Sequence, residues 1–194
     1  MLKLNDSKTE FFISSSPHQM TRLADIKIHI GEAEIHPSST VKNLGVHFDA
    51  AMTMSDHVTA ICKSVNFHLW NLSRIRKYIT QEACSNAMRA LVLSKLDYAN
   101  ALLSYLSNKD IIRLQCLQNR TARIIFQVPR RHSSSPLLKS LHWLPVDSHI
   151  KFKIMLYRYK ILKNMTPVYL SSCVKIHVPA REGLRSTMDT TCLK

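Results

Sequence analysis

Residues 55–78, SDHVTAICKSVNFHLWNLSRIRKY, carry an apolar pattern with the period of an α-helix. Ser55 is a candidate N-cap, and Asp56 follows in the first turn, where the helix dipole favours a negative charge. Apolar residues then recur at spacings of three and four, as they do on one face of an amphipathic helix: Val58, Ile61, Val65, Leu69, Leu72 and Ile75. The pattern predicts one long helix over residues 56–78.

Two further helices are expected directly after this one. Thr80 can cap the first, with Glu82 near its positive end, and the pattern continues to residue 105 with room for a bend near Asp97. Asn108 opens the second, which ends at Pro129 because proline cannot continue a helix. One side of this second helix carries Ile111, Leu114, Leu117 and Ile124.

The C-terminal part of the chain also favours helices. Residues 130–136, RRHSSSP, form a polar and basic connection, in which Ser135 can cap a short helix and Pro136 can take its first position. Residues 149–163, HIKFKIMLYRYKILK, predict another helix. Its expected buried stripe is Ile150, Ile154, Tyr157 and Ile161. From about Lys175 the periodicity stops, and we expect a loosely ordered tail.

The first 49 residues have the alternating pattern of strands. Residues 25–36, DIKIHIGEAEIH, alternate apolar and polar side chains on either side of Gly31 and predict a β-hairpin. Residues 41–49, VKNLGVHFD, predict a third strand. The sequence therefore predicts a small antiparallel β region ahead of the helices.

These segments together predict an α+β protein that is predominantly α. The expected domains are a β region over residues 1–50, a helical bundle over residues 51–174 and the tail over residues 175–194. Three glycines in 194 residues agree with a helix-rich chain, because glycine mainly serves tight turns.

The net charge of +14 belongs to the second part of the chain. Residues 1–60 contain five Lys/Arg and seven Asp/Glu, whereas residues 61–194 contain 22 Lys/Arg and six Asp/Glu. Such an excess gains counterion-release free energy on binding a polyanion, so nucleic acid is the leading partner class. Acidic membrane surfaces and ribosomal or histone-like contacts stay open.

Cysteine usage and hydropathy favour an intracellular protein, cytoplasmic or nuclear. The five cysteines are dispersed and form no C-x-x-C pair, so we expect reduced thiols: Cys62, Cys84, Cys116, Cys173 and Cys192. No apolar run approaches the roughly 18 residues of a membrane span, and the N-terminus lacks the pattern of a secretory signal. On these grounds we expect no membrane partner, while charge alone leaves an acidic membrane surface open.

Six segments occur in the order that they have in a known family: LKLNDSKTEFFI, VKNLGVHFD, LVLSKLDYANALL, LQCLQNRTARII, LLKSLHWLPVDSHIKFKIMLYRYKIL and GLRS. Over nearly its whole length the chain resembles the C-terminal part of the reverse transcriptases, or RNA-directed DNA polymerases, of animal LINE (non-LTR) retrotransposons in the jockey-like branch. The resemblance implies that the first segment is the end of the palm, that KNLGVHFD is the primer-grip hairpin, and that the helices from residue 55 form the thumb and the region after it.

The sequence departs from this family in lacking a fingers region and a tyrosine-x-Asp-Asp signature. Two-metal phosphoryl transfer needs carboxylates that hold the ions. The resemblance therefore implies Mg²⁺ only for a full-length parent, and we expect this chain alone to be inactive as a polymerase. The apolar side chains of Leu2, Leu4 and residues 11–13 are expected to pack on a palm outside this chain, with Met1 either an internal methionine of the parent or a replacement.

The expected function of such a fragment is binding of an RNA/DNA hybrid or duplex. Candidate contacts lie in five places: Lys8 in the palm-like segment, Lys42, Asn43 and Gly45 in the primer-grip-like turn, Arg74, Arg76 and Lys77 at the end of the first helix, Arg113, Arg120 and Arg123 on one face of a later helix, and Arg130 and Arg131 in the loop after it. Each place has a structural alternative. Lys8 can be an ordinary surface lysine, and Gly45 can mark a β-bulge. The cations at the helix end can compensate the helix dipole, and the later arginines can belong to a solvated basic face.

Other clusters predict no catalytic or metal site. His142 and His149 straddle Pro145, and His57 and His68 are eleven residues apart, so neither pair has the spacing that a zinc site favours. The serines at 133–135 have no orienting acid nearby in the sequence. Four aromatic residues are candidates for base stacking, although their helical spacing is more typical of a core: Trp70, Trp143, Tyr157 and Tyr159.

Two alternatives to the polymerase fragment remain. The first is a host-adopted helical module that binds a protein, which predicts a large exposed apolar groove. The second is a degenerate reading frame without a selected role.

Overall fold

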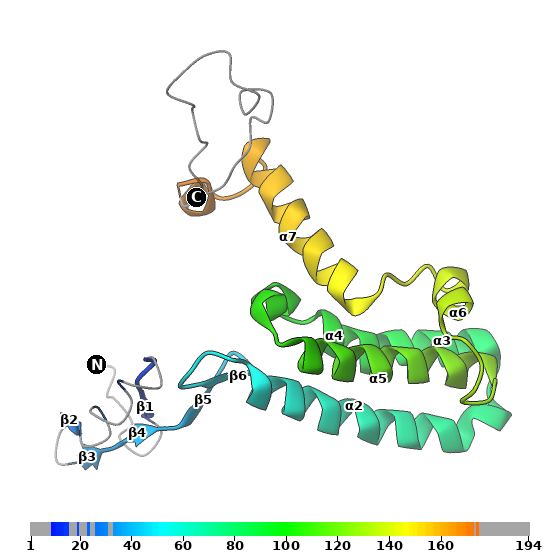
Figure 1. Ribbon diagram of the computed structural model, residues 1–194, viewed down its shortest axis with the longest axis horizontal. Helices are drawn as coiled ribbons and strands as arrows, with labels where there is room; N and C mark the ends of the chain where they lie inside the picture. Colours follow the sequence, from blue (N-terminus) through cyan, green and yellow to red (C-terminus); the bar gives the residue numbers. More distant parts are fainter. Residues whose placement is uncertain are drawn as a thin grey trace, which may run out of the picture. The chain divides into compact units, whose positions relative to one another are not determined.

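Figure 1 shows the computed structural model of the protein, which describes residues 9–15, 19, 23, 26–30, 33–172 and 174. Short strand pairs precede a series of helices, which confirms the predicted α+β class with an excess of α. The chain divides into two compact units, residues 1–150 and 151–194. The expected boundaries after residues 50 and 174 stay predictions, and Lys8 and the tail from residue 175 lie outside the described residues.

Short strands pair in the N-terminal part of the first unit. β2 (Ile28–Ile30) pairs antiparallel with β3 (Ala33–Ile35), which confirms the predicted hairpin, while Gly31 between them lies outside the described residues. β1 (Phe11–Phe12) pairs parallel with β4 (Pro37–Ser38).

The predicted single strand over residues 41–49 is wrong, because the chain reverses in its middle. β5 (Thr40–Asn43) and β6 (Val46–Asp49) form an antiparallel pair. Leu44 and Gly45 between them have φ values of 47° and 83°. Positive φ at both central residues is the geometry of a tight two-residue hairpin turn.

α2 (Ser55–Ile75) continues into a 3₁₀ turn, η2 (Arg76–Tyr78), and the two elements together cover the predicted first helix. The prediction that Ser55 caps this helix is wrong. Met54 precedes the helix, with a φ of 61°, and Ser55 is the first helical residue. The Ser55 hydroxyl instead donates to the Asp110 carboxylate at 3.0 Å.

The predicted helical segment up to residue 105 is divided into four consecutive elements: α3 (Gln81–Met88), the π-helical η3 (Arg89–Leu93), α4 (Ser94–Asp97) and the 3₁₀-helical η4 (Asn100–Tyr105). Thr80 caps α3 as predicted, since its hydroxyl accepts from the Ala83 N–H at 3.2 Å. Ala99 has a φ of 53° between α4 and η4, which confirms the bend expected near Asp97.

The later helices are α5 (Asn108–Phe126), α6 (Ser135–Ser140), α7 (Val146–Leu162) and α8 (Val168–Ser171). α5 begins as predicted, with Ser107 as its cap, but it ends at the left-handed Gln127 before Pro129 is reached. Ser135 is the first residue of α6 and Ser134 precedes it, so the prediction that Ser135 caps this helix is wrong.

The core of the first unit lies between α2, the segment from α3 to η4, and α5. Its fully buried large side chains include Val58, Val65 and Leu69 of α2, Met88 and Val92 of the middle segment, and Leu114 and Ile125 of α5. The predicted apolar stripe of α2 is therefore confirmed as a core face, except at Ile75, which is 47% exposed.

The predicted buried stripe of α7 is wrong in the second unit. Ile154 and Tyr157 are exposed, and Ile161 is only half-buried. Ile150, which belongs to the first unit, is buried as predicted. α7 carries apolar side chains around its whole circumference, so a stripe chosen by spacing alone does not identify a buried face.

Candidate nucleic-acid interface

α2 and α5 lie side by side and run in the same direction (Figure 1). Two hydrogen bonds align them: Arg113 Nη2 donates to Thr59 Oγ1, and Arg120 Nη1 donates to Asn66 Oδ1, each at 3.1 Å. The donors are seven residues apart on α5, and the acceptors are seven apart on α2. Because seven residues make about two helical turns, both bonds lie on one edge of the helix pair.

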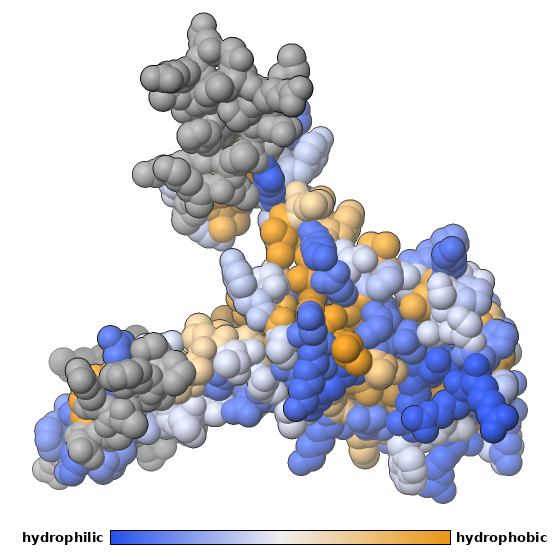
Figure 2. Space-filling view, viewed as in Figure 1, coloured by the Kyte–Doolittle hydropathy of each residue, from blue (hydrophilic) through white to orange (hydrophobic). Residues whose placement is uncertain are grey.

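The C-terminal halves of α2 and α5 border a groove of about 1060 Å³. Half of the residues proposed from the sequence for nucleic-acid contact line it: Arg74, Arg76, Lys77, Arg120, Arg123 and Arg130. None of the described residues around this groove is acidic. Strongly hydrophilic side chains gather at the end of the helical part where α2 and α5 terminate (Figure 2).

Arg120 and Arg123 are held in place by single hydrogen bonds to the protein. Arg120 donates to Asn66, and Arg123 Nε donates to the His132 carbonyl at 3.0 Å. A guanidinium group has five N–H donors in a planar fork. One bond to the protein therefore fixes each side chain and leaves donors for an oxyanion.

Arg76 has a structural place in this groove. Its side chain is 9% exposed, and Nε and Nη2 donate to the carbonyls of Ile124 and Ile125, with the shortest contact at 2.6 Å. Nη1 donates to the Ile79 carbonyl at 2.9 Å. The last carbonyls of a helix lack partners within the helix, so Arg76 caps α5. The sequence offered Arg76 either as a phosphate contact or as compensation of the helix dipole; in the structure its guanidinium donates to carbonyls of the protein.

Arg74 and Lys77 form the outer border of the groove, where α2 faces solvent. Arg74 Cζ lies 4.8 Å from the centre of the Trp70 ring, and Lys77 Nζ lies 4.8 Å from that of Tyr78. Both cations are exposed. A cation over an aromatic face is attracted by the quadrupole of the ring, so these rings help to fix the two charges at the rim.

Arg113 lies outside this groove and is engaged with the start of α5. Its Nη1 donates to Asp110 Oδ1 at 2.8 Å. Burial tends to raise the pKa of Asp110, but hydrogen bonds from Arg113, Ser107 and Ser55 outweigh burial and lower this pKa. Asp110 is therefore charged and fully engaged, and Arg113 neutralises it rather than extending the basic groove.

Two of the candidates from the hairpin of β5 and β6 border a second pocket in the first unit. Lys42 and Gly45 line a pocket of about 500 Å³ together with Lys95 of α4. The Tyr98 hydroxyl donates to the Leu44 carbonyl and ties the hairpin turn to the helices. Two further candidates line neither pocket: Asn43, exposed in β5, and Arg131, exposed in the loop after α5.

His57 lies beside this second pocket and is 4% exposed. Burial, and then the neighbouring His47, lower the pKa of His57. The two rings stack with centroids 6.3 Å apart. His57 Nδ1 accepts from the His47 N–H at 3.5 Å, and its Nε2 is buried without a hydrogen-bond partner. The imidazole is therefore held neutral, with Nδ1 as the acceptor.

Sequence reasoning missed the uncharged polar residues of the basic groove. They are Asn66 and Ser73 from α2, and Asn119 and Gln127 from α5 and its end. Asn66 and Ser73 are seven residues apart, as are Thr59 and Asn66. A row of polar residues spaced by seven, next to the apolar face, therefore marks in the sequence the edge of α2 that contacts α5.

Comparisons with protein-family models, curated proteins and solved structures find no match for this chain. Among the described residues, no three His, Cys, Asp or Glu side chains are grouped closely enough to hold a metal ion. In that same part of the chain, every helix is too short or too polar to span a membrane.

Proposed function

We propose that this chain binds nucleic acid without sequence preference through the groove between α2 and α5. It does so as the thumb-like part of a reverse transcriptase of the LINE type that its sequence resembles. The observation that carries the proposal is the convergence of cations from α2, α5 and the following loop on one groove whose described lining has no acidic residue.

The arrangement favours phosphates over other anionic groups. Arg74, Lys77 and Arg130 are exposed, and Arg120 and Arg123 are oriented by hydrogen bonds to the protein. Contacts of this kind position a backbone and carry no base information. If the groove neutralises about four phosphates of a duplex, log K falls with log salt at a slope of about −3.6.

The proposal includes no polymerase activity for this chain alone. The sequence has no tyrosine-x-Asp-Asp signature, and two-metal transfer requires carboxylates that hold both ions. The proposed parent would supply Mg²⁺ chemistry from a palm and fingers region, which are then partners of this chain. Primer extension by the isolated chain would contradict this part of the proposal.

The test is binding of a labelled RNA/DNA hybrid, followed by fluorescence anisotropy over a salt series. The groove variant combines Lys77→Gln, Arg120→Gln and Arg123→Gln. The matched control, Arg89→Gln with Lys109→Gln and Lys139→Gln, removes the same charge at exposed positions outside the groove. We expect the groove variant to lose at least about tenfold in affinity and to have a salt slope shallower by about three. Equal losses in both variants would overturn the assignment to the groove.

A second candidate function rests on α7. Phe152, Met155 and Tyr159 are 50%, 68% and 56% exposed and lie three and four residues apart, so they form one apolar face. Such a face is typical of a protein contact and favours a helical protein-interaction module. Sedimentation of the full chain tests self-association through α7. If the wild type sediments as a monomer at all concentrations, as the double variant Phe152→Ser, Met155→Ser should, self-association through α7 is excluded.

A further inference from the structure

The solvent face of α2 carries exposed aromatic side chains beside the basic groove. Phe67 and Trp70 of α2 are 62% and 53% exposed, and Tyr78 of the adjoining turn η2 is 76% exposed. The fully buried residues of this helix, Val65 and Leu69 among them, lie on the opposite face. Aromatic residues of this size normally bury most of their surface, so this face requires an explanation beyond the packing of the fold.

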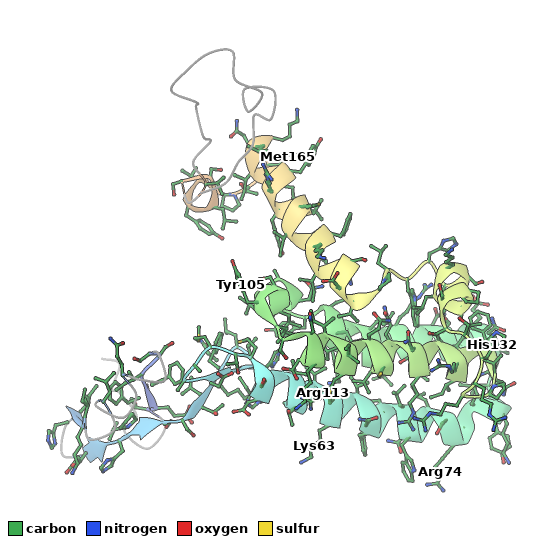
Figure 3. The ribbon with its side chains drawn as sticks, viewed as in Figure 1. Lys63, Arg74, Tyr105, Arg113, His132 and Met165 are labelled. Atoms are coloured by element: carbon green, nitrogen blue, oxygen red, sulfur yellow. The ribbon has the colours of Figure 1, made fainter. Side chains whose placement is uncertain are left out.

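Cations flank these rings along the same face. Lys63, Phe67, Trp70 and Arg74 follow one another at spacings of four, three and four, which places them on one side of a helix. Lys63 and Arg74 extend from the same side of α2, away from α5 (Figure 3). Asp56, in the first turn, is the one acidic residue in α2. The charge of this face therefore complements a polyanion.

We propose that this face stacks unpaired bases and that the preferred ligand is single-stranded nucleic acid, an inference that rests on the proposed function. The aromatic–cationic face is defined by Lys63, Phe67, Trp70, Arg74 and Tyr78. A single strand presents bases and phosphates at once, and stacking on aromatic side chains accepts any base. In a duplex the bases are already stacked on one another, so the rings gain little.

Shared border residues link the aromatic–cationic face to the groove. Arg74 and Lys77 line the groove and also lie over Trp70 and Tyr78. A phosphate held by Arg74 therefore has its base within reach of the indole ring. Trp70 is half-exposed, so one side of the ring takes the base while Arg74 remains over the ring. Arginine planes themselves also stack on unpaired bases.

An abasic oligonucleotide separates stacking from phosphate binding. The probe is a labelled oligothymidylate of roughly 12 nucleotides, a length that suits one single-strand site, and its partner is an abasic chain with the same number of phosphates. We expect the full protein to bind the oligothymidylate about tenfold more tightly than the abasic chain. Trp70→Ala should remove most of this preference and change affinity for the abasic chain far less than affinity for the oligothymidylate.

Two further variants control the test. Trp70→Phe keeps a ring and should retain most of the preference. Tyr105→Ala removes a 95% exposed aromatic side chain that lies on η4, away from α2 (Figure 3), and should change neither affinity. Because Trp70 is exposed, Trp70→Ala should keep the wild-type circular dichroism spectrum and melting curve. A variant that fails this criterion is replaced by Trp70→Gln.

The outcomes distinguish this inference from the proposed function. Equal, salt-dependent binding of both oligonucleotides would overturn base stacking and leave phosphate binding by the groove intact. Failure to bind the RNA/DNA hybrid as well as both oligonucleotides would overturn both, whereas binding of the hybrid alone would overturn only the inference about single strands. If Trp70→Ala weakened binding to phosphatidylserine vesicles and left oligothymidylate binding unchanged, the face would be a membrane contact and the inference would be wrong.

Discussion

The hydroxyl of Ser55 donates a hydrogen bond to the carboxylate of Asp110 over 3.0 Å, and this bond joins the first turns of α2 and α5. The same carboxylate accepts from the Ser107 hydroxyl at 2.9 Å and from Arg113 at 2.8 Å. Arg76 caps α5 at the opposite end of the helix pair. Polar side chains thus fix both ends of the two helices whose C-terminal halves border the basic groove.

The bond between Ser55 and Asp110 should be measurable as a coupling free energy. We expect Asp110→Ala to lower the free energy of unfolding by about 2 kcal/mol, because it leaves three donors without their acceptor. In a double-mutant cycle with Ser55→Ala, the coupling should be about 1 kcal/mol. Urea unfolding of the four proteins provides the measurement. Losses that add within about 0.3 kcal/mol would show that the contact is energetically silent.

Arg76 should matter for stability far more than its neighbours. Arg76→Met removes the hydrogen bonds that the buried guanidinium donates to the carbonyls of Ile79, Ile124 and Ile125. We expect the free energy of unfolding to fall by about 3 kcal/mol. Arg74→Met is the matched control, since Arg74 is exposed two residues earlier. This control should change stability by less than about 0.5 kcal/mol. Similar midpoints of urea unfolding for both variants would contradict the capping role of Arg76.

The sequence predicts α2 well because its apolar period is long and regular. The spacing also indicates that Arg76 is buried, because it lies four residues after Leu72 and seven after Leu69, on the core face of the helix. The prediction missed this because it treated the three cations at the end of the helix as one group. Arg74 and Lys77 lie on other sides of the helix and reach the groove. The candidate site was therefore predictable in part, by sorting the basic residues according to whether they lie on the apolar face of the helix.

Tertiary contacts explain most of what sequence reasoning missed. The prediction that Ser55 caps α2 is wrong because the serine hydroxyl donates to Asp110, 55 residues away in the sequence. The strand over residues 41–49 failed because Leu44 adopts a positive φ, which is uncommon for leucine. The α7 stripe failed because spacing cannot select a face on a helix that is apolar all round. In each case the local pattern was compatible with more than one structure.

Folding should become less favourable as the pH falls below the ordinary titration range of histidine. His57 titrates near 6.5 in the unfolded chain, and burial together with His47 lowers its pKa in the folded state. Between these two pKa values the unfolded chain binds more protons than the folded chain. The contribution of His57 to the free energy of unfolding should therefore be constant above about pH 6.5. It should decrease below that pH until the imidazole of the folded chain is also protonated.

Replacing the histidine isolates this contribution. We expect the His57→Gln variant to show a shallower decrease in the free energy of unfolding between neutral and mildly acidic pH than the wild type. His68→Gln, at a half-buried position of the same helix, is the matched control for replacing an imidazole by an amide. The measurement is urea unfolding at a series of pH values. A His57→Gln variant with the wild-type slope would show that His57 is not held neutral by the fold.

The hairpin turn before the second pocket provides a pair of opposite substitutions. Gly45 has a φ of 83°, and a Cβ there would lie 3.7 Å from the Tyr98 ring, which is ordinary contact. Strain in the backbone rather than a clash should thus make Gly45→Ala destabilising, by about 1 kcal/mol. Leu44, 84% exposed with a φ of 47°, already bears such strain. Leu44→Gly relieves this strain but raises the conformational entropy of the unfolded chain. We therefore expect the free energy of unfolding to rise by only about 0.5 kcal/mol. Thermal unfolding of both variants measures the difference, and a stabilising Gly45→Ala would contradict the two-residue turn.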